Sequence, residues 1–195
     1  MTRQISRFRR LLAAFFLVCC WGVVADIPPP HSFEGIKIGG QALELIRKFE
    51  GFSSTAYPDM ITGGAPWAYG YGFTTKADGK PVAPGDRISR KQADNRLVKE
   101  TEKYCGGALK GIPTEYLTQN RIDAATSLCW NIGVPNLLRS VFFKKWVQGD
   151  VDGAAKAMTH WVARGTNAER VLRARRQVEI ALFRAKDPVL MGNLQ

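Results

Sequence analysis

The chain has 195 residues, a formal net charge of +11 and 45% hydrophobic side chains. This length suits one compact domain with terminal extensions, and the hydrophobic fraction excludes a wholly disordered chain. A basic surface favours polyanionic partners such as nucleic acid, anionic lipid or an acidic cell-wall polymer, although a solvated basic face would give the same charge. No nucleic-acid-binding motif accompanies the charge, so we expect no nucleic-acid partner.

The first 25 residues have the composition of an export signal. Residues 1–10 contain four arginines and no acidic residue, and residues 11–25 are uninterrupted apolar sequence. A basic region before a short apolar run is typical of a secretory signal, and a membrane-spanning helix would need about 20 apolar residues. We expect either cleavage before Asp26 or a retained signal-anchor that contacts the membrane transiently through residues 11–25. Both outcomes place the rest of the chain on the exported side of that membrane.

A linker, a folded domain and a short tail follow the export signal. Residues 26–40 are predicted to be a linker because they include three consecutive prolines, which cannot be helical. The folded domain is expected over residues 41–187 and the tail over residues 188–195. The domain opens with apolar side chains at helical spacing, and Gly51 is predicted to end this first helix. These side chains are Ala42, Leu45, Ile46 and Phe49.

The rest of the domain is predicted to be mostly helical. Residues 55–75 combine glycines, prolines and aromatic residues in a pattern that favours twisted β-hairpins. Ser89 and Gln92 form a capping box that predicts a helix running to about Tyr104. Residues 118–132 are predicted to form a central buried helix, and shorter helices are expected near 137–148, 150–163 and 167–185. The predicted class is α+β and mostly helical, with a small α+β lobe containing β-hairpins beside a larger helical lobe.

Four cysteines and two histidines restrict the metal chemistry of the chain. Neither the adjacent pair Cys19 and Cys20 nor the pair Cys105 and Cys129 has zinc-ligand spacing, so we expect no metal and no other cofactor. In an exported protein, Cys105 and Cys129 are candidates for a disulfide, which would stabilise the fold by up to about 3 kcal/mol. Two buried free cysteines are the alternative, and exchange with Cys19 or Cys20 is also open.

Two carboxylates, Glu50 and Asp59, lie where the helical pattern gives way to extended sequence. Cutting a glycosidic bond requires one carboxylic acid that protonates the leaving oxygen and a second carboxylate that activates water or attacks the sugar. Glu50 follows Phe49 at the end of a helix, a setting that raises the pKa of a carboxyl group. Asp59 follows Pro58 at a turn, where it can stay ionised. From spacing alone, Glu50 could instead lie on the surface and Asp59 could be a turn residue.

Several motifs resemble the phage-type lysozyme (endolysin) family, glycoside hydrolase family 24. They are Phe-Glu-Gly at 49–51, Asp59, the Gly-rich aromatic segment at 66–72, the Asn-Ile-Gly ending at 131–133 and the closing segment at 175–183. The resemblance covers roughly residues 35–185, and the N-terminus resembles the exported branch of the family. This implies export to the bacterial periplasm, with transient contact of residues 11–25 with the inner membrane.

The resemblance implies a lysozyme-like catalytic domain over residues 41–187, with a cleft between its two lobes. It implies Glu50 as general acid and Asp59 as the carboxylate that positions water or stabilises the transition state. The expected substrate is the β-1,4 bond between N-acetylmuramic acid and N-acetylglucosamine in peptidoglycan, hydrolysed with inversion. We expect a monomer whose partner is peptidoglycan.

The sequence departs from the family pattern at two places. Ala68 occupies the position of a threonine that helps to hold the attacking water, and Phe73 occupies the position of a histidine. A hydroxyl from Thr62, Thr74 or Thr75 could reach the water from another direction. Without one, hydrolysis would be slow or the sugar's own 6-hydroxyl would attack. A lytic transglycosylase and a catalytically impaired peptidoglycan-binding module are therefore alternatives to the hydrolase.

Other side chains are candidates for substrate contacts. Trp67, Tyr69 and Tyr71 could stack on sugar rings or fill the core of the small lobe. Asn131 could contact an acetamido group or cap the helix before Gly133. The arginines between residues 170 and 176 could bind an anionic wall polymer, or form a solvated helix face paired with neighbouring glutamates.

Overall fold

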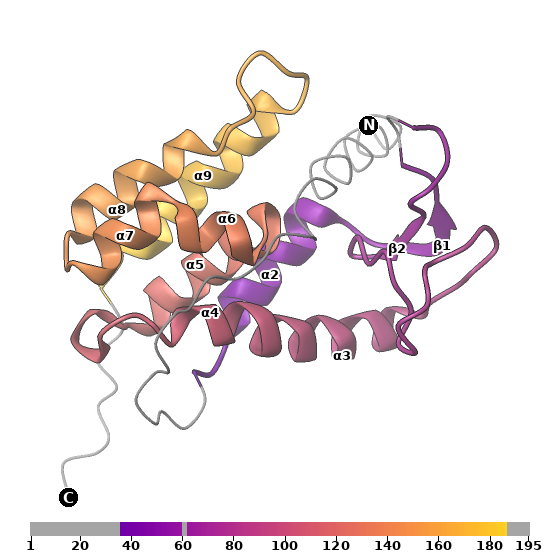
Figure 1. The fold of residues 1–195 in the computed structure, drawn as a ribbon, viewed down its shortest axis with the longest axis horizontal. Helices are drawn as coiled ribbons and strands as arrows, with labels where there is room; N and C mark the ends of the chain where they lie inside the picture. Colours follow the sequence, from indigo (N-terminus) through magenta and orange to yellow (C-terminus); the bar gives the residue numbers. More distant parts are fainter. Residues whose placement is uncertain (1–35, 60–61, 187–195) are drawn as a thin grey trace, which may run out of the picture.

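The structure, a computed structural model, describes residues 36–59 and 62–186. This part of the chain is mostly helical and contains one two-stranded antiparallel sheet (Figure 1). The predicted α+β, mostly helical class is confirmed. The predicted export segment at 1–25 and the tail at 188–195 lie outside the described residues, as does most of the linker. Within the described ranges, no helix is long and apolar enough to cross a membrane.

Helix α2 (Gly40–Glu50) leads directly into the sheet. It ends at Gly51, as predicted, because the backbone there has a φ of 67° in the left-handed region, which glycine adopts without strain. The chain then enters strand β1 (Ser53–Tyr57), which pairs with the antiparallel strand β2 (Ala68–Gly70). Glu50 therefore lies at the junction between the first helix and the sheet.

Helix α3 (Arg90–Glu100) runs from the side of the sheet towards the helical lobe (Figure 1). The predicted capping box is present, since the Ser89 hydroxyl accepts the Gln92 N–H at 3.2 Å and the Gln92 side chain accepts the Ser89 N–H at 2.9 Å. The helix continues as a π-helical turn, η2 (Thr101–Gly106), and the short α4 (Gly107–Leu109). Side chains from α2, α3 and the sheet region form the small-lobe core. Its buried members are Ile46, Tyr69, Tyr71, Phe73, Val82, Ile88, Ala93 and Leu97.

The central helix of the larger lobe is α5 (Gln119–Ile132), which packs against α2 and α9 (Glu169–Arg184). It begins at Thr118, whose hydroxyl accepts the Arg121 N–H at 3.3 Å, and it ends at Gly133 as predicted. The short 3₁₀ turn η3 (Thr114–Tyr116) precedes it. Because α5 is covered on both sides, it forms the centre of the main hydrophobic core.

The helices between α5 and α9 differ from the prediction. The segment expected as one helix at 137–148 forms α6 (Val134–Arg139) and α7 (Val141–Val147). The break falls at Ser140, whose hydroxyl accepts the Phe143 N–H at 3.0 Å and so caps α7. Helix α8 (Val151–Ala157) is shorter than the predicted 150–163 because the 3₁₀ turn η4 (Met158–His160) follows it.

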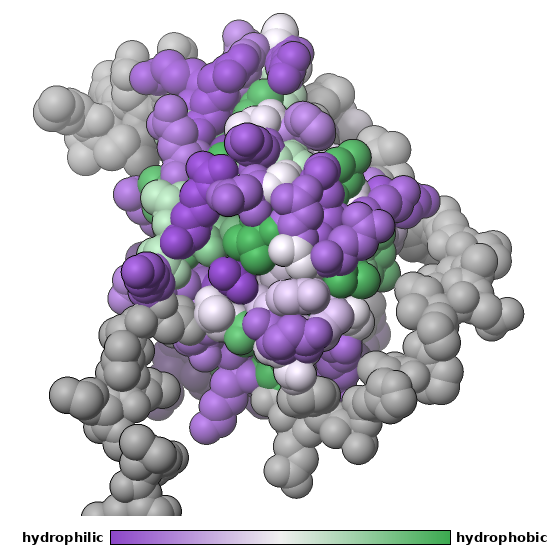
Figure 2. Space-filling model, turned by 90° about the vertical axis from the view of Figure 1, so that its left-hand side faces the viewer, coloured by the Kyte–Doolittle hydropathy of each residue, from purple (hydrophilic) through white to green (hydrophobic). Residues whose placement is uncertain are grey.

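The end of the helical lobe is drawn in Figure 2, which turns the left-hand side of Figure 1 towards the viewer. Hydrophilic side chains dominate this face, and apolar ones form separate patches between them. This pattern is that of an ordinary solvated surface.

Cys105 and Cys129 are bonded to each other in the structure. The disulfide joins η2 to α5, with 5.9 Å between the two Cα atoms and a sequence separation of 24. The bond therefore ties the end of the helix that leaves the small lobe to the centre of the larger lobe. Cys19 and Cys20 lie outside the described residues.

Reduction of this disulfide is expected to lower the free energy of unfolding by about 3 kcal/mol, because the open chain gains entropy when unfolded. Urea unfolding of the wild type with and without reductant measures the loss. In the double variant Cys105→Ala/Cys129→Ala, reductant should have no effect. Equal unfolding midpoints for oxidised and reduced wild type would contradict the prediction.

Candidate active site

Glu50, the last residue of α2, is buried: its side chain is 5% exposed. This excludes the surface position that spacing alone left open. Burial is the main cause that raises the pKa of Glu50 above its ordinary value of 4.5, and the opposing charge and hydrogen bond of Arg175 do not offset it. A carboxyl group in this environment can keep its proton at a pH where an exposed one would lose it.

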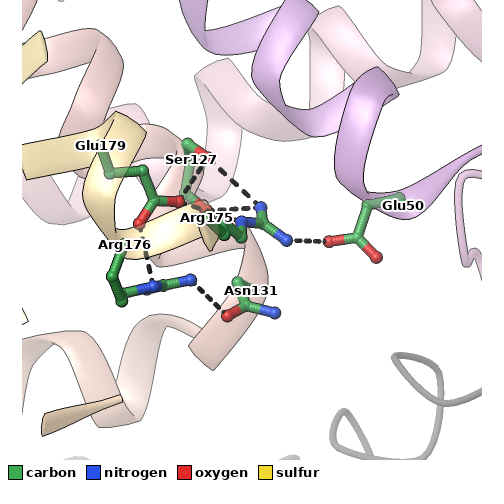
Figure 3. Close-up of polar contacts among 6 residues, drawn as sticks. All are labelled: Glu50, Ser127, Asn131, Arg175, Arg176 and Glu179. Carbon is green, nitrogen blue, oxygen red and sulfur yellow. Dashed lines mark hydrogen bonds and ion pairs between the residues drawn. The ribbon is translucent and has the colours of Figure 1, made fainter. Parts of the chain in front are cut away.

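Arg175 of α9 joins Glu50 to the larger lobe (Figure 3). Its Nη1 donates to Glu50 Oε1 at 2.7 Å, its Nε donates to Glu179 Oε1 at 3.0 Å, and its Nη2 donates to the Ser127 carbonyl at 2.9 Å. The guanidinium group is fully buried. It is therefore held from α5 and α9 and fixes the orientation of the Glu50 carboxyl group.

Arg176 continues this network on the side away from Glu50 (Figure 3). Its Nη2 donates to Asn131 Oδ1 at 2.6 Å, and its Nε lies 3.1 Å from Glu179 Oε2. Burial lowers the pKa of Arg176 to about 10, so the group stays charged at neutral pH. The predicted solvated or polymer-binding arginine face is wrong for Arg175 and Arg176, because both side chains are buried.

A sequence signal for this burial exists. The buried residues of α9 repeat at the spacing of one helix face, and that face contains both arginines between apolar side chains. They are Leu172, Arg175, Arg176, Glu179 and Phe183. Glu179 on this face pairs with both arginines, and Glu50 of α2 pairs with Arg175, so the face can be buried despite its charged residues.

Asn131, near the end of α5, lies beside Arg176. Its side-chain oxygen accepts the Arg176 N–H. The side chain is therefore held by the arginine and does not serve as the helix cap considered above. Its Nδ2, drawn in Figure 3 on the side away from Arg176, has no hydrogen-bond partner within the described part of the chain. Contact of Asn131 with an acetamido group stays a prediction.

Asp59 follows β1 and is 3% exposed. Its Oδ1 accepts the Thr62 N–H at 2.9 Å, and its backbone is hydrogen-bonded to Gly63 and Gly64. Asp59 thus holds a turn, and the same contact fixes the direction of its carboxylate. Its catalytic role stays a prediction.

The aromatic residues of the glycine-rich segment lie mainly in the core. Tyr69 and Tyr71 are 5% and 1% exposed, and the Tyr71 hydroxyl donates to Asp94 at 2.7 Å. This corrects the prediction that these two rings stack on sugars, because their faces are covered by the small-lobe core. Trp67 is half-buried and packs against the edge of that core, so its contact with substrate stays a prediction.

Two of the three threonines considered as water-holding groups have structural roles. The Thr62 hydroxyl donates to the Ala65 carbonyl at 2.8 Å, and the Thr75 hydroxyl accepts from Arg96 at 3.1 Å. Ala68 opens β2 and is buried. Phe73 is also buried, with the Arg96 guanidinium 4.2 Å from its ring centre.

The fold and this site together define a class of protein. The buried carboxyl group at the end of the first helix and the aspartate after the first strand are the two kinds of group that a glycoside hydrolase requires.

Comparisons with known proteins lead to the same class. The sequence model of the phage lysozyme family matches residues 47–179. An endolysin of Acyrthosiphon pisum secondary endosymbiont phage 1 is 33% identical over 75% of this chain and 97% of its own length. The SAR-endolysin of Escherichia phage 933W is 31% identical over 67% of this chain and 73% of its own length. The solved endolysin from Escherichia coli O157:H7 phage FAHEc1 has a TM-score of 0.64 and 32% identity, covering 77% of this chain and 96% of that chain. The chain belongs to the phage lysozyme family.

Proposed function

We propose that this protein is an endolysin that hydrolyses the β-1,4 bond between N-acetylmuramic acid and N-acetylglucosamine in bacterial peptidoglycan and thereby lyses the host cell. Membership of the phage lysozyme family supports this function, as do relatives named endolysin. The observation that carries the proposal is Glu50, a buried carboxyl group whose pKa is raised and whose orientation Arg175 fixes.

The two carboxyl groups divide the chemistry between them. Glu50 is the general acid that protonates the bridging oxygen as the glycosidic bond breaks. Asp59 is the carboxylate that takes a proton from the attacking water and stabilises positive charge on the sugar. Trp67 and Asn131 are the proposed contacts to the sugar chain. Peptidoglycan is the partner, and the enzyme acts as a monomer without cofactor or nucleic acid.

We also propose that the enzyme acts in the periplasm. The basic region followed by an apolar run at residues 1–25 supports export, and relatives named SAR-endolysin support a signal-anchor that contacts the inner membrane through residues 11–25. Residues 41–187 would then form the catalytic domain on the periplasmic side, after the linker at 26–40.

Ala68 favours a second candidate function. Because this residue has no hydroxyl group, an attacking water could lack a contact, and the 6-hydroxyl of the sugar could attack in its place. The products would then be those of a lytic transglycosylase. A peptidoglycan-binding module would release no product.

Mass spectrometry of the fragments released from purified peptidoglycan tests these functions. The full chain is expected to release muropeptides with reducing N-acetylmuramic acid ends. Fragments with 1,6-anhydro ends alone would replace the hydrolase with a transglycosylase. No release at enzyme concentrations that still bind peptidoglycan would leave only the binding module.

A further inference from the structure

Hydrolysis with inversion requires a water molecule held on the face of the sugar opposite the leaving oxygen. A carboxylate can accept one proton of this water, and a second polar group is needed to fix its orientation. The structure engages Thr62 and Thr75 elsewhere, and Ala68 has no hydroxyl group. A hydroxyl group from another part of the sheet can supply the contact in place of these residues.

The two strands of the sheet identify a candidate on the face away from the small-lobe core. The register of β1 against β2 shifts between Ser53 and Tyr57, so the alternation of faces applies here only to the last two residues of β1. Ala56 packs against that core, and its neighbour Tyr57 therefore points to the opposite face. In β2, Tyr69 is a member of the core, so its neighbour Ala68 also points to the opposite face. Tyr57 and Ala68 are partners in the strand register, and their side chains therefore lie side by side.

The Tyr57 hydroxyl lies within the electrostatic range of Glu50. Burial first, and then the negative charge of Glu50, raise the pKa of Tyr57 to about 12, so its phenol stays neutral at pH 7. Tyr57 is the last residue of β1 and precedes Asp59 by two residues. The phenol is thus within the electrostatic influence of Glu50 and lies next in the chain to the turn that holds Asp59.

We propose that the Tyr57 hydroxyl holds the attacking water, in the place that the methyl side chain of Ala68 cannot fill. This inference rests on the proposed function. It assigns to this enzyme a catalytic group supplied by β1 instead of β2.

The proposed step balances as follows. Glu50 transfers its proton to the bridging oxygen as the bond between that oxygen and the anomeric carbon breaks. The water oxygen forms the new bond to the anomeric carbon and transfers one proton to Asp59. The other O–H of the water donates a hydrogen bond to the Tyr57 oxygen, and the phenol remains protonated throughout. If the water is misplaced, the 6-hydroxyl of the sugar can form that bond and give a 1,6-anhydro end.

The substitution Tyr57→Phe removes the hydroxyl and keeps the ring. The expected result is a fall of about 100-fold in kcat for peptidoglycan hydrolysis, the effect of misplacing a reacting group, with a larger share of 1,6-anhydro ends. Tyr69→Phe, which removes a hydroxyl from the core face of the same sheet, is the matched control and should keep the wild-type rate. A wild-type rate and wild-type ends in Tyr57→Phe would overturn the proposal.

The double variant Tyr57→Phe/Ala68→Thr separates a lost water contact from a damaged fold. A threonine at 68 returns a hydroxyl to the same face of the sheet. The double variant should therefore be at least about 10-fold faster than Tyr57→Phe and should again release mainly reducing ends. A double variant no faster than Tyr57→Phe would overturn the proposal. If the wild type itself releases no fragments, the proposed function fails; if the wild type is active and Tyr57→Phe equals it, only the role of Tyr57 fails.

Discussion

Glu50→Gln is expected to lower the rate of peptidoglycan hydrolysis by about 10²- to 10⁴-fold, the range that general acid catalysis supplies. The amide has the shape of the carboxyl group and its oxygen can still accept the Arg175 N–H that Glu50 accepts at 2.7 Å. It has no proton to give to the leaving oxygen. Loss of turbidity in a suspension of cells stripped of their outer membrane measures the rate. Equal rates for variant and wild type would remove Glu50 as the acid.

The pH dependence of the wild-type rate is a second readout of the same residue. The acid works only while it is protonated, so the rate should fall as pH rises through the pKa of Glu50, which lies above the ordinary 4.5. The residual rate of Glu50→Gln should lack this fall.

Unfolding is the control for both measurements. The pKa of Glu50 is raised in the folded state, so ionisation of Glu50 destabilises the fold. The contribution of protonated Glu50 to stability is therefore present below its unfolded pKa and is lost as pH rises through its folded pKa. Glu50→Gln should therefore be at least as stable as wild type at neutral pH. A less stable variant would mean that lost folding contributes to its lost activity.

Arg175→Met is expected to lower the free energy of unfolding by about 3–5 kcal/mol, the cost of removing one partner from a buried ion network. The substitution leaves Glu50 and Glu179 buried without the cation that contacts both. Methionine fills much of the same volume, so packing should account for little of the loss. Urea unfolding at neutral pH measures the change.

Arg173→Met on the same helix is the matched control. Arg173 is exposed and pairs with Glu169 one helical turn away, and such surface pairs contribute about 1 kcal/mol or less. Arg175→Lys keeps the charge but loses the planar group that reaches Glu50, Glu179 and Ser127 together, so its loss should lie between the two. Similar losses for Arg173→Met and Arg175→Met would show that the buried network is not what stabilises this helix.

Local signals in the sequence predict much of the fold. The capping box at Ser89 and the glycines at 51 and 133 place helix ends correctly, because a cap acts through residues within one turn of it. The break between α6 and α7 at Ser140 is not predicted, because the apolar pattern continues across it. The only local signal for the break is that serine can cap a helix.

The site is less accessible to sequence reasoning because its electrostatics depend on distant segments. The partner of Glu50 is 125 residues away along the chain, on a helix whose many arginines suggest a solvated face. Whether a tyrosine of the glycine-rich segment faces the core depends on strand register, which a spacing pattern does not determine. Glu50 and Asp59 could be nominated from their position and the family resemblance, whereas Arg175 and Tyr57 required the structure.

The contact between Glu50 and Arg175 also has a consequence for the order in which the enzyme becomes competent. Translation produces Glu50 early, and α9, which holds Arg175, comes 125 residues later. Until α9 has been made and has packed against α5, the Glu50 carboxyl group lacks the cation that orients it. A partly synthesised chain therefore contains both carboxylates but not the arranged site. The carboxyl group on α2 is thus oriented only when α9, the last long helix of the domain, is in place.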